Sequence, residues 1–207
     1  MTRLVMTLLL ATSVLFIAAC GGGGFASNEY LGDLPGMAQS YYEDLESLDE
    51  KLENTTSMEK AFKYDKEMDQ MEDEADEKLE AYAEEHSFEP LPYEIIGNTG
   101  YTVKEVRVVG AEYCKLELEM DIEFAEEPKS KYGGKVYEFY TYGACYDKEG
   151  NLLNGRIVFS GSNTEDNPFK PGTVVTLKGS QYNLNELVDF ANLKLMAKDE
   201  YDKLASK

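Results

Sequence analysis

Apolar and polar residues alternate without interruption through one stretch in the middle of the chain. From Cys114 to Phe124 every second residue is apolar, and the residues between them are Lys, Glu or Asp. Successive side chains of a strand point to opposite faces of a sheet, so the pattern predicts a strand with one buried and one water-facing side. Similar but less regular patterns predict further strands over residues 103–109, 136–146, 152–159 and 173–177.

Turn sequences separate these predicted strands. Asp147–Asn151 reads DKEGN and Lys170–Gly172 reads KPG, and both contain the Gly or Pro that tight turns need. Several short strands without helices between them predict an antiparallel β-sandwich over residues 90–207.

The end of the chain allows two interpretations. Asn183 could cap a single helix that continues through Leu204. Leu193 and Leu195, however, alternate with polar neighbours, and this favours a last strand followed by a short helix from Asp199 to Ala205.

A helical period precedes the strands. Tyr41, Leu45, Leu48 and Leu52 recur at four-three-four spacing, which places them on one face of a helix. A second seam of the same kind runs through Ala61, Tyr64, Met68, Met71, Ala75 and Tyr82. Residues 56–59 (TSME) fit a capping box at the start of this second helix, with Thr56 as the N-cap. The spacing therefore predicts an antiparallel helical hairpin over about residues 36–86, ended by Pro90 and Pro92.

These patterns together predict an α+β protein, in which a helical hairpin at residues 35–89 is followed by the β-sandwich of residues 90–207. Charge divides the chain at the same place. The 207 residues carry a net charge of −20, and 21 Asp and Glu oppose only 5 Lys between Glu29 and Glu89. Such a surface repels phosphate backbones and anionic headgroups, so we expect no nucleic-acid partner.

Five acidic residues of the second predicted helix recur three or four positions apart: Asp65, Asp69, Asp73, Asp76 and Glu80. Like charges at this spacing destabilise a helix, which suggests a contact surface for a basic protein or for divalent cations. A solvated face that keeps the protein soluble is the alternative, and it is favoured.

The first residues have the layout of a secretory signal. Arg3 precedes an apolar run from Leu4 to Ile17 that is too short to span a membrane permanently. Its ending, Ile17-Ala18-Ala19-Cys20, resembles the lipobox of bacterial lipoproteins. The resemblance implies that residues 1–19 are removed and that Cys20 is lipidated, with residues 20–34 as anchor and flexible tether. It also implies a membrane partner through this anchor and a place in the cell envelope, with the outer membrane favoured.

A second resemblance concerns the strands. Residues 146–153 (YDKEGNLL) and 169–177 (FKPGTVVTL) resemble the immunoglobulin-like modules of bacterial lipoproteins that carry an FxLYD-type motif. The resemblance implies an immunoglobulin-like sandwich that serves for binding or as a spacer, without catalytic residues.

Candidate chemistry is sparse. The one histidine, His86, falls at the predicted end of the second helix, where a capping role is favoured over catalysis or metal binding. No sequence of a nucleotide-binding loop is found, since the glycines of the tether, Gly21 to Gly24, precede no strand–helix unit that could hold a phosphate. We expect no cofactor. Carboxylates are plentiful, so a hydrolase with two acidic residues stays open as an alternative.

The remaining two cysteines, Cys114 and Cys145, both fall on predicted apolar strand faces. The envelope is commonly oxidising, so a disulfide between them and two separate buried thiols are open alternatives.

We therefore expect a lipid-anchored, non-enzymatic binding or spacer module for an envelope protein or glycan. The alternative to a protein partner is a glycan held by exposed Tyr side chains, since the chain has 15 Tyr and no Trp.

Overall fold

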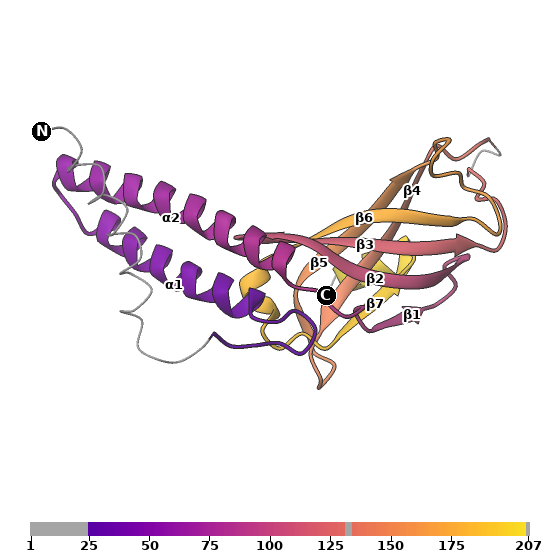
Figure 1. Cartoon of the computed structure of the whole chain (residues 1–207), viewed down its shortest axis with the longest axis horizontal. Helices are drawn as coiled ribbons and strands as arrows, with labels where there is room; N and C mark the ends of the chain where they lie inside the picture. The colour runs from indigo at the N-terminus through magenta and orange to yellow at the C-terminus, as the bar shows by residue number, and fades with distance from the viewer. Residues whose placement is uncertain (1–24, 131–133, 206–207) are drawn as a thin grey trace, which may run out of the picture.

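The computed structural model describes residues 25–130 and 134–205, so Cys20 and the signal sequence lie outside the described residues. The described chain has the predicted α+β order. A helical hairpin projects from one end of a single curled sheet (Figure 1).

The hairpin consists of α1 (Leu34–Glu53) and α2 (Met58–Glu85). Leu45 and Leu48 of the predicted first seam are buried, as is Ala75 of the second. The predicted capping box is wrong by one residue. Ser57 has the extended backbone of an N-cap and its hydroxyl accepts a hydrogen bond from the Lys60 N–H at 3.4 Å. No described helix is both long and apolar enough to span a bilayer.

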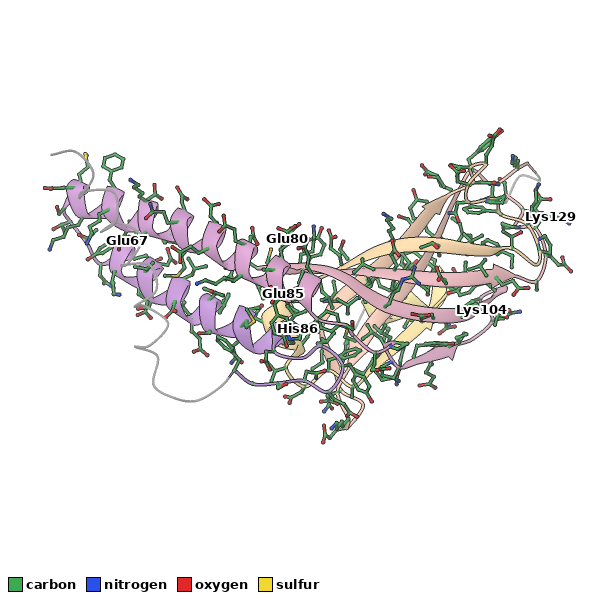
Figure 2. The ribbon with its side chains drawn as sticks, viewed as in Figure 1. Glu67, Glu80, Glu85, His86, Lys104 and Lys129 are labelled. Atoms are coloured by element: carbon green, nitrogen blue, oxygen red, sulfur yellow. The ribbon has the colours of Figure 1, made fainter. Side chains whose placement is uncertain are left out.

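The C-terminal end of α2 confirms the capping role predicted for His86. Its ring Nδ1 lies 2.9 Å from the carbonyl oxygen of Tyr82, and its ring stacks on the Tyr82 ring at 3.7 Å. His86 lies directly after the last residue of α2 (Figure 2), so both contacts close the last turn of the helix.

One sheet contains all the described strands, in the order β1-β7-β4-β5-β6-β3-β2. The pair β1 and β7 is parallel and the other pairs are antiparallel. The elements are β1 (Tyr93–Ile96), β2 (Tyr101–Glu112), β3 (Lys115–Phe124), β4 (Glu138–Tyr146), β5 (Leu152–Ser162), β6 (Val174–Tyr182), the 3-10 turn η1 (Leu184–Leu187), β7 (Asn192–Met196) and α3 (Lys198–Ala205).

This single sheet differs from the two facing sheets of the expected immunoglobulin-like sandwich. Among the described residues, β5 and β6 share one paired position, Ser160 with Lys178, and the strands on either side run in different directions (Figure 1). The sheet curls so far that the segment just before β1 reaches the other edge strand, β2, where the Leu91 N–H donates to the Val106 carbonyl at 2.8 Å. Alternating strands at short spacing are common to sandwiches and curled sheets, so the pattern could not distinguish them.

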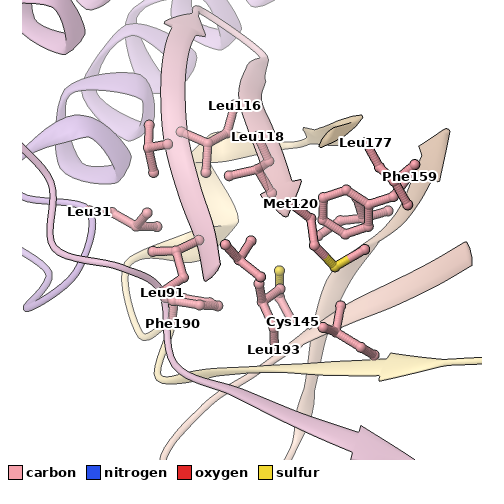
Figure 3. Close-up of a cluster of buried hydrophobic side chains, with 14 of the residues drawn as sticks. Leu31, Leu91, Leu116, Leu118, Met120, Cys145, Phe159, Leu177, Phe190 and Leu193 are labelled. Carbon is pink, nitrogen blue, oxygen red and sulfur yellow. The ribbon is translucent and has the colours of Figure 1, made fainter. Parts of the chain in front are cut away.

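The curled sheet encloses the main hydrophobic core (Figure 3). Leu116, Leu118 and Met120 of β3 point inward, as their alternation predicts, and meet Phe159 and Leu177 from the neighbouring strands. Side chains from segments outside the sheet cover the remaining open side of the core. They are Leu31, Leu91 and Phe190.

A buried amide fixes the chain start at the junction of hairpin and sheet. The Asn28 side-chain amide donates to the carbonyls of Val188 and Phe190 at 2.9 and 2.8 Å, and its oxygen accepts from the N–H groups of Tyr30 and Leu31. Ala26 also passes so close to the first turn of α1 that a Cβ on Gly36 would lie 2.3 Å from its carbonyl oxygen. The first described residues are therefore held beside the start of α1.

The tail follows the favoured interpretation of a last strand and a short helix. Asn183 adopts a left-handed conformation with φ of 57° and leads into η1, so it does not cap a long helix. The strand β7 then pairs with β4 and β1, and α3 packs Tyr201 and Leu204 against the outside of the sheet.

Candidate functional site

The side of the sheet that faces away from the main core carries the candidate site. We call this side the outer face. On β5, Ile157 and Phe159 are buried in the core, so Arg156, Val158 and Ser160 point outward. The same alternation places Lys178, Ser180 and Tyr182 of β6 on the outer face.

Two clefts flank the point where β5 and β6 cross. The first cleft has a volume of about 550 Å³ and the second about 400 Å³, and Ser160 and Lys178 border both. Other residues lining the first cleft include Glu117, Arg156, Val158, Ser180 and Tyr182. The second cleft includes Glu138, Tyr140, Ser162, Asn167 and Thr176. The divergence of two paired strands thus opens concave surfaces on an otherwise continuous sheet.

The first cleft holds positive charge that is weakly compensated. In the part of the chain that the structure describes, no carboxylate lies within 4.0 Å of the Arg156 guanidinium. Lys178 is 3.8 Å from Glu119, and its side chain is 81% exposed. Glu119 is already bound more closely by Arg107, at 2.7 Å. Arg156 and Lys178 are therefore available to an anionic group.

A network on β2, β3 and β6 supports the floor beside this cleft. Arg107 Nη1 donates to Asp121 Oδ2 at 2.6 Å, and the Thr176 hydroxyl donates to Asp121 Oδ1 at 2.7 Å. Partial burial by itself would raise the pKa of Asp121, but these hydrogen bonds outweigh it and lower the pKa below its usual value. Asp121 therefore stays ionised and holds the three strands in register.

Each cleft has one carboxylate among its lining residues, and each carboxylate has a partner. Glu117 Oε1 lies 2.9 Å from Lys115 Nζ, and this contact raises the pKa of the Lys115 ammonium. The Tyr140 hydroxyl donates to Glu138 Oε2 at 2.6 Å, and this hydrogen bond raises the pKa of Tyr140. Neither cleft lining therefore brings two acids together, as the alternative hydrolase would need.

The tyrosines considered as sugar platforms divide into two groups. Tyr137 and Tyr140 are 70% and 50% exposed, and Tyr182, which the sequence did not single out, is 58% exposed. Tyr142 instead stacks on Tyr201 of α3 at 4.6 Å, and Tyr146 is buried beside α3. Two of these tyrosines, Tyr142 and Tyr146, therefore pack against the tail helix, and the other three remain open to a ligand.

The predicted acidic face lies on the exposed side of α2, where Figure 2 shows Glu80. Across the described residues, none of its five members takes part in an ion pair. Asp76 has an internal partner that the pattern did not predict, because its Oδ1 accepts a hydrogen bond from the Tyr113 N–H at 2.6 Å. Within the described residues there is also no group of three or more potential metal ligands.

The structure shows neither the disulfide nor the two buried thiols that the sequence left open as alternatives for these cysteines. Both thiols are free, with Cys145 buried and Cys114 exposed. Cys114 lies in the turn between β2 and β3 instead of on the strand's apolar face, so only Cys145 points into the core (Figure 3). Cys145 Sγ lies 3.6 Å from Gln181 Oε1, to which it donates.

Sequence reasoning missed the two clefts because they form where β5 and β6 cross. It therefore also missed Arg156 and Lys178, which line the first cleft. One signal was present: Arg156 is one of three arginines in a chain of net charge −20, and it alternates with core residues of β5. No family model, curated protein or solved structure matches the chain. The outer face is therefore interpreted from its own chemistry.

Proposed function

We propose that the chain is a lipid-anchored, non-enzymatic binding module of the cell envelope, and that the outer face of its sheet holds the partner. The observation that carries this proposal is the pair of clefts at the crossing of β5 and β6. Concave surfaces lined by hydroxyl groups, charged groups and exposed rings are typical of binding sites.

The position of the chain start favours binding over a spacer role for the hairpin. Cys20 precedes Phe25, the first described residue, by five positions, which a chain can span over at most about 18 Å. Ala26 is held beside Gly36, at the start of α1. A lipid on Cys20 would therefore anchor the junction of hairpin and sheet, and the hairpin would not separate the sheet from the membrane.

A glycan is the second candidate partner, favoured over an apolar protein surface by the residues of the clefts. Tyr140 and Tyr182 offer half-exposed rings, and Ser160, Ser162 and Ser180 offer hydroxyls beside them. Aromatic rings with neighbouring hydrogen-bonding groups suit the apolar and polar faces of a sugar.

Anchoring is tested with radiolabelled palmitate in cells that produce the full chain or its Cys20→Ala variant. The proposal expects label in the first and none in the second, because the lipobox resemblance places the lipid on the Cys20 thiol. Equal labelling of the two chains would rule out this anchor.

Binding is tested by sedimentation of the purified full chain, in detergent, with envelope material from cells that lack it. We expect Tyr140→Ser with Tyr182→Ser to weaken binding by at least about tenfold, since the two rings together can contribute about 1.4 kcal/mol or more. The matched control is Tyr42→Ser with Phe62→Ser, which removes two exposed rings from the hairpin. If only the hairpin variant binds less envelope material, or if neither variant does, binding at the outer face is refuted.

A further inference from the structure

The first cleft combines features that select one class of ligand. Its two cations come from neighbouring strands: Arg156 has no carboxylate within 4.0 Å among the described residues, and Lys178 has only Glu119, at 3.8 Å. The described contact of the Arg156 guanidinium is with the ring of Tyr201, at 5.8 Å from its centre, and this contact leaves its charge without a counter-ion. An external carboxylate can take that place through two parallel N–H···O hydrogen bonds.

The rest of the cleft is suited to hydroxyl groups. Ser160 and Ser180 can donate and accept, and Glu117 accepts only. Val109 and Val158 form an apolar floor, and the ring of Tyr182 stands at the edge with 58% of its surface exposed. A volume of about 550 Å³ is large enough for two or three sugar rings.

We propose that the first cleft binds an acidic oligosaccharide, with one uronic acid carboxylate on Arg156, a second on Lys178, and sugar hydroxyls on Glu117 and the two serines. This inference rests on the proposed function and names the ligand class of the same face. A sugar acid supplies both kinds of partner, a carboxylate for the cations and hydroxyl donors for Glu117. An acidic peptide has few hydroxyl donors for Glu117, and a dianionic phosphate group has none.

The test is calorimetric titration of the full chain in detergent with trigalacturonate, and with galactotriose and triglutamate as comparison probes. Trigalacturonate should bind at least about tenfold more tightly than galactotriose, because hydrogen bonds to a charged group are the stronger ones. Arg156→Gln and Lys178→Gln should each weaken trigalacturonate binding by about tenfold. The matched control Lys104→Gln removes the same charge from a lysine paired with Glu123 and should change it by less than about twofold.

Three results would overturn the proposal: no binding of trigalacturonate, equal binding of triglutamate, or unchanged affinity in Arg156→Gln. Melting temperatures check that each variant is folded. We expect them to stay close to that of the wild type, because the substituted side chains are exposed. If trigalacturonate does not bind but the variant Tyr140→Ser with Tyr182→Ser still sediments less with envelope material, the ligand class is wrong and the proposed binding module stands. If the tyrosine pair also has no effect, both proposals fail.

Discussion

At the scale of single residues, the two thiols of the described chain differ because only one is buried. Burial raises the pKa of Cys145 to about 12, so almost no thiolate exists at neutral pH. Cys114 is exposed in its turn. We predict that a maleimide labels one thiol of the native Cys20→Ala chain within minutes and the second only after unfolding. A native chain that labels only after reduction would contain the bridge that the structure lacks.

Asn28 contributes to stability through four hydrogen bonds in a buried place. Asn28→Ala leaves the carbonyls of Val188 and Phe190 without their donor, and we predict a loss of about 2–3 kcal/mol in the free energy of unfolding. Chemical denaturation measures it. As a control, Asn98→Ala removes an acceptor from an exposed turn and should cost less than about 0.5 kcal/mol. Equal losses would mean that Asn28 does not hold the junction.

The sequence predicted correctly which side chains of β3 are buried. It did not predict which residues belong to a turn and are therefore exposed. The inward residues of β3 were placed correctly, because only one orientation of the strand buries all its apolar side chains. Cys114 continues the same alternation, yet it lies in the turn that precedes β3 and is exposed. Hydrophobic periodicity does not record the point at which a strand stops.

At the scale of elements, α2 is joined to the sheet by one of its acidic residues. Asp76 accepts a hydrogen bond from the Tyr113 N–H, whereas Asp69 has no hydrogen-bond or ion-pair partner among the described residues. We predict that Asp76→Ala is less stable than Asp69→Ala by about 1 kcal/mol, since the exposed bond is charge-assisted but screened by solvent. Both changes raise helix propensity equally, so the difference in unfolding free energy reports the bond.

The same pair tests the function suggested for the acidic face. If the two variants are equally stable, the Asp76 contact contributes nothing and the face is uniformly solvated. If both melt well below the wild type, further internal partners exist that the described contacts do not include.

Most elements could be predicted from the sequence, and their arrangement could not. The hairpin, the strands β2 to β6 and the tail all follow local periods. The short strand β1 has no buried face to give an alternating pattern. The pairing of β1 with β7 and of β3 with β6 joins segments far apart in the chain, and no local period specifies such partners.

At the scale of the whole molecule, the hairpin and the sheet differ in surface chemistry. The hairpin extends about 42 Å along α2 and carries most of the negative charge, whereas the outer face adds cations, hydroxyls and rings. We infer that the hairpin keeps the anchored protein soluble and that the outer face recognises the partner. The candidate site escaped prediction because Arg156 of β5 and Lys178 of β6 line one cleft only through the pairing of these two strands.

Photo-crosslinking in living cells tests the central claim most directly. Benzoylphenylalanine replaces Val158, which lies in the first cleft, or Phe62, which is exposed on the hairpin. Both side chains are accessible, so either position can report a neighbour. The account predicts a higher-mass adduct from position 158 on illumination and none from position 62. An adduct from position 62 alone, or from neither position, would contradict it.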